Sequence, residues 1–510
     1  MKFKTTIQYI ALVGLFFLFF ACGTTKTSLT QVPEAHPKRE FRGVWVQTVG
    51  QSRFQQMNSA AMKHYFVQMI NKFEAAGINA VIFQIRPEAD AFYKSDLEPW
   101  SRFFTGKQGK APDDPDFDPL SFLIEECHKR GIELHAWLNP YRAQSNVMND
   151  LAPQHIYWDH PERFLNYGNQ LYFDPGLPEN RAYIVNVVRD IVSRYDVDAI
   201  HMDDYFYPYP IAGQPFPDDN SFITYAASQG FSLNQRGDWR RNNVNLLIQQ
   251  LKLAIAGTKP WVRFGISPFG IYRNKRSTID GSGSDTNGLQ NYDDLYADVK
   301  LWVENGWIDY NMPQLYWEIG HNAADYTTLL EWWNANNFKQ PLYIGQDLKR
   351  SVDANELEDK IHQTRSHTFV DGNSYWYGYL ILDNYADVAN TLSTDIHRAK
   401  SLIPAYKHMH EGRPPKVRKL VEVFTEDMHF LTWNSDKQPN SPETASYFVI
   451  YRFRKGERFN IEDANKIVKI TRDNFFVIPY EDGNTPYTYA VTAVDAFHNE
   501  SKEVKIKVKQ

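Results

Sequence analysis

Short apolar runs rich in β-branched and aromatic residues alternate with longer stretches of helical period over residues 38–405. The runs are FRGVWVQ, NAVIFQIRP, IELHAWLNP, DAIHMDDYF, VRFGISPFG, IDYNMPQLYW, PLYIGQDL and YGYLILDNY, and the helical stretches include AAMKHYFVQMINKFEAAG, DPLSFLIEECHKRG and NRAYIVNVVRDIVSRY. Eight strand–helix units predict an α/β fold, a (β/α)8 TIM-type barrel with long insertions after several strands. An open doubly wound sheet is the competing fold, but no glycine-rich phosphate loop follows the first run.

The pattern changes after the barrel region. Residues 406–418 are basic and proline-containing, which predicts a linker. Residues 419–510 then show short alternating runs (HFLTWN, SYFVIYRF, NFFVIPY, YTYAVTAVD and SKEVKIKVK), the period of a small all-β sandwich. Trp433, Tyr451 and the stretch YTYAVTAVDAFHNES resemble a fibronectin type III module. Because such modules usually space or dock other domains, we assign this one no catalytic residue.

The first residues predict export. A short positively charged start, the apolar stretch IALVGLFFLFFA and the sequence FACG resemble a bacterial lipoprotein signal over residues 1–22, with Cys22 as the lipidated residue. Residues 23–37 are polar and predict a flexible tether. We therefore expect a lipid-anchored protein of the cell envelope, at the outer membrane and facing the periplasm or the surface. A plain signal peptide or a short anchor is the alternative. Cys127 is the other cysteine, so the processed chain offers no intramolecular disulfide.

Composition narrows the class of partner. The chain has 510 residues and a formal net charge of −6, which gives no basic field for nucleic acid. Its 13 Trp and 30 Tyr supply flat apolar faces of the kind that stack on sugars, although most of them will be core residues. A polysaccharide substrate fits this composition better than a nucleic acid does, and the sequence does not predict the oligomeric state.

The alternation of side chains along each barrel strand indicates which residues face the barrel axis. In DAIHMDDYF, the apolar Ile200 and Met202 should pack against the helices, which turns His201 and Asp203 inward. The same parity turns these side chains inward on the first three runs: Trp45, Gln47, Gln84, Arg86, His135, Trp137 and Asn139. Because active sites of this fold lie at the carboxyl ends of the strands, polar residues there predict a catalytic or binding site.

Two adjacent carboxylates, Asp203 and Asp204, follow the fourth run. Adjacent acids repel one another, and two close carboxyl groups with separated pKa values can hold one proton between them. Glycosidic cleavage needs one carboxyl to protonate the leaving oxygen and a second group at the anomeric centre. Glu318, after the sixth run, is a third candidate, and Tyr205 and Tyr207 would form an aromatic wall. In a substrate-assisted alternative, the amide of a 2-acetamido sugar attacks, one aspartate orients that amide, and the other is the acid.

Two other functions stay open at this point. The first is a metal-dependent polysaccharide deacetylase, with His135, His201, Asp203 and Asp204 as ligands. Within the predicted barrel, residues 38–405, the sequence contains no H-x-H, H-x-x-x-H or cysteine-rich cluster, so we expect no metal and no cofactor. The second is a catalytically inactive, glycan-binding scaffold, which the tether and the C-terminal module would suit.

Several motifs carry a family resemblance: EFRGVWVQTVG, INAVIFQIRPEADAFY, GIELHAWLNPYR, LYFDPGLPENRAYI, VDAIHMDDYFYP, FGISPFGIYRN and IDYNMPQLYW. Over residues 38–400 the chain resembles the glycosyl hydrolase-like 10 family of bacterial envelope lipoproteins. This resemblance implies a (β/α)8 glycoside hydrolase that cleaves cell-envelope glycan, with peptidoglycan strands as the leading substrate. It also implies that Asp203 and Asp204 are the catalytic acids.

The predicted substrate-binding set combines this resemblance with strand parity. The resemblance places Gln84, Arg86, His135, Asn139, Tyr141, Arg142, Gln314, Tyr316 and Trp317 at sugar sites. Position on the strands and beside the acids adds Trp137, His201 and Tyr205.

Overall fold

The computed structural model describes residues 36–509 except 338–339, 427, 437, 439–440 and 481–485. His36–Gln510 forms one compact unit. The predicted signal peptide with Cys22, and the predicted tether up to residue 35, lie outside the described residues. Within the described range, none of the helices combines the length and the apolarity needed to cross a bilayer.

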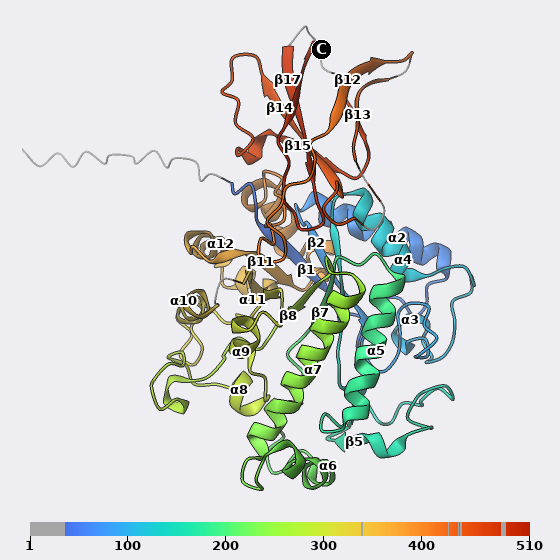
Figure 1. Cartoon of the computed structure of the whole chain (residues 1–510), viewed down its shortest axis with the longest axis vertical. Helices are drawn as coiled ribbons and strands as arrows, with labels where there is room; N and C mark the ends of the chain where they lie inside the picture. The colour runs from blue at the N-terminus through green and yellow to red at the C-terminus, as the bar shows by residue number, and fades with distance from the viewer. Residues whose placement is uncertain are drawn as a thin grey trace, which may run out of the picture. The chain divides into compact units, whose positions relative to one another are not determined.

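A closed barrel of eight parallel strands forms the centre of the fold (Figure 1), which confirms the predicted fold class. Around the barrel the order is β1-β2-β3-β7-β8-β9-β10-β11. The strands are β1 (Phe41–Val46), β2 (Ala80–Arg86), β3 (Glu133–Leu138), β7 (Ala199–Met202), β8 (Arg263–Ile266), β9 (Tyr310–Asn311), β10 (Leu342–Asp347) and β11 (Val370–Trp376).

The position predicted for the eighth strand was wrong. The run YGYLILDNY contains the short helix α13 (Tyr379–Leu382), whereas β11 is built from VDGNSYW just before it. Because β11 contains several polar residues, a search for apolar runs does not detect it. Asn373 is buried but hydrogen-bonded to Gln346 and Thr364. A Cβ atom at Gly372 would lie 2.1 Å from the Phe41 carbonyl oxygen, so only glycine permits the close pairing with β1.

Helices surround the barrel, and the sequence marks where several of them begin. Asn58 and Asp118 each accept a hydrogen bond from a backbone N–H in the first turn of α2 and α4, respectively. The helices are α2 (Ser59–Ala75), α3 (Arg102–Thr105), α4 (Pro119–Lys129), α5 (Pro178–Arg194), α6 (Asp219–Tyr225), α7 (Arg236–Thr258), α8 (Asn291–Asp294), α9 (Val299–Glu304), α10 (Tyr326–Asn336), α11 (Leu348–Asp353), α12 (Leu357–Ser366), α13 and α14 (Val388–Thr391).

Strand parity divides the apolar residues between two cores. Ile200 and Met202 belong to the large core between the strands and the helices, as predicted. Phe41, Tyr310 and Tyr343 pack inside the barrel, where the rings of Phe41 and Tyr343 stack with centroids 4.0 Å apart. The barrel interior is therefore filled by side chains, as is usual for this fold.

Two sets of strands lie outside the barrel. The insertion after β3 forms a small sheet of order β4-β6-β5: β4 (Arg142–Gln144), β5 (Phe164–Tyr167) and β6 (Gln170–Phe173). The C-terminal module has the strands β12 (Arg418–Phe424), β13 (His429–Asn434), β14 (Tyr447–Arg454), β15 (Ile467–Thr471), β16 (Phe475–Val477), β17 (Pro486–Val494) and β18 (Val504–Lys509). Its antiparallel sheets have the orders β12-β13-β16 and β15-β14-β17-β18, so the module is all-β, as predicted.

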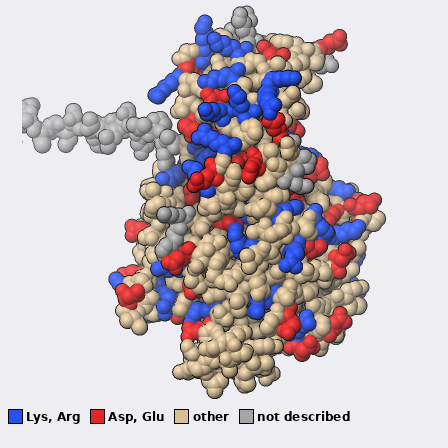
Figure 2. Space-filling model, in the orientation of Figure 1, with Lys and Arg blue, Asp and Glu red and all other residues tan. Residues whose placement is uncertain are grey.

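The module packs against the amino ends of the barrel strands. Glu133 begins β3 and Arg263 begins β8, and both contact His498 of the module. The opposite end of the barrel, where the strands finish, is not covered by these contacts. On the face of the molecule drawn in Figure 2, acidic and basic side chains are interspersed over the barrel, and basic ones are frequent over the module.

Candidate active site

A cavity of about 230 Å³ lies at the carboxyl ends of the barrel strands. It is lined by Trp45, Trp137, Asp203, Asp204, Tyr205, Tyr209, Ser267, Phe269, Gln314, Tyr316, Trp317 and Trp376. A larger cavity of about 390 Å³ lies between the amino end of the barrel and the module. We take the smaller cavity as the candidate site because it joins two carboxyl groups to an aromatic wall at the end of the barrel where active sites form.

Strand β7 delivers the carboxyl groups to this cavity. Its four residues are all buried, and Asp203 and Asp204 follow directly after Met202. Because Met202 packs toward the helices, the alternation turns Asp203 inward, where its carboxylate contacts Trp137 and Asn139. The predicted parity of β7 is therefore confirmed.

Asp203 is surrounded by groups that stabilise its ionised form. Its carboxylate accepts a hydrogen bond from the Trp137 indole (3.1 Å) and another from the Asn139 amide (3.0 Å). Burial raises the pKa of Asp203, and the positive charge of Arg142 together with these hydrogen bonds opposes that increase. Asn139 in turn accepts a hydrogen bond from the Arg142 backbone N–H at 2.7 Å, which fixes the amide that holds Asp203.

Asp204 lies in an environment that favours its protonated form. Burial, and then the negative charge of Asp203, raise the pKa of Asp204 to about 7. The Tyr209 hydroxyl and the Gln314 amide donate hydrogen bonds to its two oxygens and partly oppose this shift. The pair therefore has the unequal environments that the sequence predicted for two adjacent acids.

Tyr205 and Tyr209 form one aromatic side of the cavity. Their rings stack with centroids 5.1 Å apart, and both side chains are partly exposed. The Arg142 guanidinium lies 5.7 Å from the Tyr205 ring centroid. The prediction that Tyr207 belongs to this wall was wrong, because Tyr207 is buried against Phe216 instead. Tyr209, two residues further along the same loop, takes its place.

Indole rings form the other side. Trp376 lies edge-on to Trp45 and Trp137, with ring centroids at 6.4 and 6.2 Å, and its ring is nearly parallel to that of Tyr316 at 6.5 Å. Phe269 packs edge-on to Trp317 at 5.4 Å. Flat apolar faces beside two carboxyl groups form a surface suited to a sugar ring.

Comparison with known proteins supplies the family. The sequence model described as "Glycosyl hydrolase-like 10" matches residues 40–363. The chain belongs to this family. It is 39% identical over 508 residues to the glycosyl hydrolase YngK of Bacillus subtilis, an alignment that covers 96% of this chain and 97% of YngK. It is 35% identical over 374 residues to the glycosyl hydrolase DigH of Escherichia coli K12, covering 67% of this chain and 83% of DigH.

Among solved structures, the chain is similar to the catalytic domain of a β-amylase from Paenibacillus polymyxa. The match covers 72% of this chain and 100% of that domain, at 12% identity and a TM-score of 0.46.

The structure brings together part of the substrate-binding set predicted for a chain of this family. Trp137, Tyr205, Gln314, Tyr316 and Trp317 line the cavity. Asn139 and Arg142 act from just behind it, through Asp203 and Tyr205.

Three predicted sugar-binding residues lie outside the cavity lining, and two of them, Gln84 and Arg86, bind other parts of the protein. The Gln84 side-chain carbonyl accepts hydrogen bonds from the backbone N–H groups of Thr48 and Val49, both at 2.9 Å. Arg86 binds both carboxylate oxygens of Glu98, at 2.6 and 2.8 Å, inside the protein. Tyr141 is buried as well. The position of Gln84 and Arg86 on their strand was visible in the sequence, but the groups that bind them come from other segments of the chain.

Glu318 and the two histidines also lie outside the cavity lining. Glu318 is half-buried beyond Trp317 and acts electrostatically on Lys360. His201 lies beneath the cavity, where its imidazole contacts Ser267 and Trp45. His135 lies deeper in the barrel, between Glu133 and Tyr310.

The cavity contains residues that the predicted set omitted. Trp45 was expected to face inward but was not assigned to the site, and Trp376 was missed because β11 was misplaced. Ser267 and Phe269 follow β8, and Tyr209 belongs to the loop of the acid pair. Position just after the end of a barrel strand was the signal that would have found Ser267 and Phe269.

The histidines needed by the metal hypothesis do not converge on the aspartates. The Nδ1 atoms of His135 and His201 both approach the Tyr310 hydroxyl, at 2.9 and 3.0 Å. Across the described part of the chain, no group of three or more His, Cys, Asp or Glu side chains is arranged to hold a metal ion.

Proposed function

We propose that this protein is a glycoside hydrolase that cleaves a cell-envelope polysaccharide, namely the glycan strands of peptidoglycan. The observation that carries the proposal is the pair of buried, adjacent carboxyl groups in unequal environments within an aromatic cavity at the carboxyl end of the barrel. Membership of a family whose relatives YngK and DigH are called glycosyl hydrolases supports the reaction class. The predicted lipoprotein signal supports an envelope glycan as substrate.

In this proposal Asp204 is the general acid. With a pKa of about 7 it is protonated in a large fraction of molecules at neutral pH, and it can still release its proton to the leaving glycosidic oxygen. Asp203 is the ionised partner, held by Trp137 and Asn139, and it stabilises the positive charge that develops at the anomeric carbon. The aromatic rings stack on the sugar and exclude water, which strengthens both electrostatic effects.

The deciding experiment uses the purified chain without residues 1–22. It is incubated with peptidoglycan glycan strands that carry or lack stem peptides, with and without a chelator, and the products are analysed by mass spectrometry. We expect new reducing ends that survive chelation. Loss of acetyl groups, or activity that disappears with the chelator, would favour the metal-dependent deacetylase. Strand binding without any product would favour a glycan-binding scaffold.

Tyr209→Phe should move the pH profile. Burial is the main cause of the raised pKa of Asp204, and the Tyr209 hydroxyl opposes it by donating a hydrogen bond to the carboxylate. Loss of that bond raises the pKa further, so the alkaline limb of kcat should shift upward from about pH 7, by roughly half a unit to one unit. The measurement is kcat for glycan cleavage between pH 5 and pH 9. A downward shift would contradict the assignment of Asp204 as the acid.

We further propose that the protein is anchored in the outer membrane through a lipid on Cys22. Cys22→Ser should release the protein from the membrane fraction while the activity of the soluble chain stays unchanged, because Cys22 lies outside the unit His36–Gln510 that contains the cavity. Fractionation of cells that produce each form is the measurement. A Cys22→Ser protein that remains in the membrane fraction would indicate an uncleaved apolar anchor.

The C-terminal module is proposed to be a fibronectin type III domain. Its three-stranded and four-stranded antiparallel sheets, with Trp433 and Phe448 packed together at 5.3 Å between ring centroids, support this. The proposed organisation has the barrel over 38–405, the linker over 406–418 and the module over 419–510.

A further inference from the structure

A line of buried polar side chains passes through the barrel, from its amino end to the floor of the cavity. Glu133 contacts His135 (Oε2 to Nε2, 2.9 Å), and His135 contacts Tyr310 (Nδ1 to hydroxyl, 2.9 Å). Tyr310 contacts His201 (hydroxyl to Nδ1, 3.0 Å), and His201 contacts Ser267 (Nε2 to Oγ, 2.9 Å). All five residues are buried. The proposed function uses none of these links, so their purpose needs an explanation.

The donors and acceptors at the two ends fix the direction of every hydrogen bond in this line. The Trp45 indole N–H, which can only donate, lies 3.3 Å from His201 Nε2, so that nitrogen must accept. Burial holds the pKa of His201 well below its usual value, so the ring is neutral and carries its proton on Nδ1. His201 Nδ1 therefore donates to the Tyr310 oxygen, and the Tyr310 hydroxyl donates onward to His135 Nδ1.

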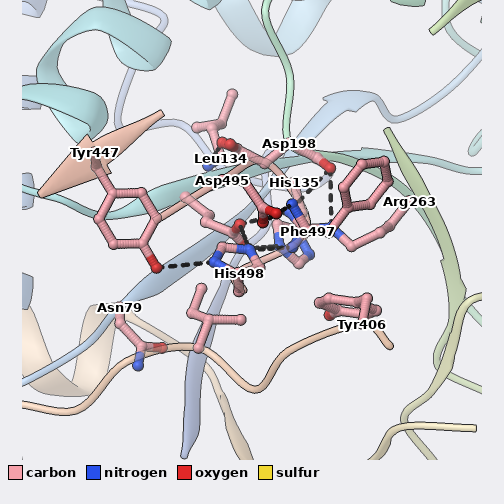
Figure 3. Close-up of polar contacts among 12 residues, drawn as sticks. Asn79, Leu134, His135, Asp198, Arg263, Tyr406, Tyr447, Asp495, Phe497 and His498 are labelled. Carbon is pink, nitrogen blue, oxygen red and sulfur yellow. Dashed lines mark hydrogen bonds and ion pairs between the residues drawn. The ribbon is translucent and has the colours of Figure 1, made fainter. Parts of the chain in front are cut away.

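The amino end of the line requires the same direction. A carboxylate can only accept, so His135 must carry its proton on Nε2 and donate it to Glu133. Burial opposes ionisation of Glu133, but Arg263 and His498 outweigh it and hold the pKa of that carboxyl well below its usual value. Arg263 donates to Glu133 Oε1 at 2.5 Å, and His498 of the module lies 2.7 Å from the same oxygen. Figure 3 shows this cluster, with His135 next to the Arg263 and His498 side chains.

The end of the line at Ser267 lies close to the acid pair Asp203 and Asp204. The single lone pair of His201 Nε2 is shared by two donors, the Ser267 hydroxyl at 2.9 Å and the Trp45 indole N–H at 3.3 Å. With its proton directed at His201, Ser267 can accept a hydrogen bond through its oxygen in the cavity that it lines. The Ser267 carbonyl accepts a hydrogen bond from the Gln314 amide at 2.9 Å, and the same amide donates to Asp204 at 3.2 Å. The orientation of Ser267 thus bears on a group that holds the proposed acid.

Gly265 on the neighbouring strand leaves room for the ring of Tyr310, the central residue of the line. A Cβ atom at Gly265 would lie 1.9 Å from Cζ of Tyr310, so glycine leaves the space that the tyrosine ring occupies. This places the Tyr310 hydroxyl between the two imidazoles.

We propose that Glu133, His135 and Tyr310 are positioning residues that hold His201 as its Nδ1–H tautomer, and that His201 thereby orients Trp45 and Ser267 beneath the reacting sugar. The catalytic consequence rests on the proposed function, whereas the tautomers are a property of the protein alone. Because Glu133 is held by His498, the C-terminal module contributes to the end of this line.

The first test determines the tautomers in the wild-type line of side chains, and variants serve only to assign the signals. In the processed chain with ¹⁵N-labelled histidine, long-range ¹H–¹⁵N spectra distinguish the two neutral tautomers, and His135→Asn and His201→Asn samples assign the signals. We expect the Nε2–H form for His135 and the Nδ1–H form for His201. The opposite tautomer at either residue would overturn the proposal, whether or not the protein cleaves any glycan.

The second test is Tyr310→Phe, which removes one hydroxyl and keeps the ring. We expect His201 to lose its single Nδ1–H form, and kcat to fall about 10- to 100-fold with KM changed less than about twofold. A loss of this size follows removal of the partners that fix the tautomer of metal-ligating histidines. Tyr343→Phe is the matched control, because Tyr343 is equally buried inside the barrel but its hydroxyl contacts Tyr406. It should change neither the tautomer nor kcat.

The outcomes separate the two proposals. An unchanged His201 tautomer or an unchanged kcat in Tyr310→Phe would overturn the positioning role, and so would equal losses in the two tyrosine variants, which would indicate a role in stability alone. If the wild-type protein cleaves no glycan, the proposed function fails, and the tautomers of His135 and His201 still decide whether the line exists.

Discussion

Asp204→Asn is expected to lower the rate of glycan cleavage by about 10³-fold or more, because a general acid contributes about 10²–10⁴-fold. Among the described residues that line the cavity, Asp203 is the one other residue with a carboxyl group. The asparagine amide oxygen can still accept the hydrogen bond from Tyr209, but its N–H groups are not acidic enough to transfer a proton to the leaving oxygen. The measurement is the appearance of reducing ends from glycan strands under single-turnover and steady-state conditions.

Glu318→Gln is the matched control for this result. Glu318 follows the sixth barrel strand and was a catalytic candidate from the sequence, but its side chain does not line the cavity. We expect this variant to keep most of its activity. Near-normal cleavage by Asp204→Asn would remove Asp204 from the role of acid. A loss of activity in Glu318→Gln as large as that in Asp204→Asn would bring Glu318 back as a candidate for that role.

A measurement of the free energy of unfolding should distinguish a loss of catalysis from a loss of folding in Asp204→Asn. The pKa of Asp204 rises from 3.8 to about 7 on folding, so the folded state binds more protons than the unfolded state between those values. The contribution of Asp204 to the free energy of unfolding is therefore lost as the pH rises from about 4 to about 7, by at most about 4 kcal/mol. Because asparagine has no such loss, the variant should gain stability relative to wild type across this interval, as measured by denaturant unfolding.

The sequence predicted the barrel and the placement of its acids because both depend on local regularities. The apolar period of two along β7 decided that Ile200 and Met202 face the helices, and this alone turned Asp203 toward the axis. The same rule predicted that His135, Trp137 and His201 face inward, and the structure confirms it. The alternation of strands and helices was enough to identify the fold, even with one strand misplaced.

The remaining errors come from contacts between distant segments. Strand β11 carries Asn373, which is buried because Gln346 and Thr364 satisfy its amide, and no local apolar pattern reveals such a partner. Arg86 points toward the site end of its strand, but Glu98 from the following loop binds it. Side chains after a strand end are harder still, since the course of a loop decides whether Tyr207 or Tyr209 enters the cavity.

The two ends of the barrel have separate tasks in this arrangement. The module closes the amino end through charged groups such as Arg263 and His498, while the carboxyl end keeps a cavity for a ligand. Stability of the barrel can thus be supplied at one end without restricting access to the other, which is a general advantage of this fold.

Asp203→Asn should also lower cleavage by about 10³-fold or more, for a different reason. The variant removes the negative charge that faces the developing positive charge at the anomeric carbon, and Trp137 and Asn139 then hold a neutral amide. The raised pKa of Asp204 is due first to burial and then to the charge of Asp203. Removal of that charge lowers the pKa of Asp204, so the alkaline limb of the residual activity should shift from about pH 7 to a lower pH. Asn139→Ala is the matched control: it keeps the charge and removes one hydrogen bond, so we expect a loss of about 10- to 100-fold. The pH dependence of residual kcat decides the matter, because a large loss of rate with the alkaline limb unmoved would show that the group titrating near pH 7 is not Asp204.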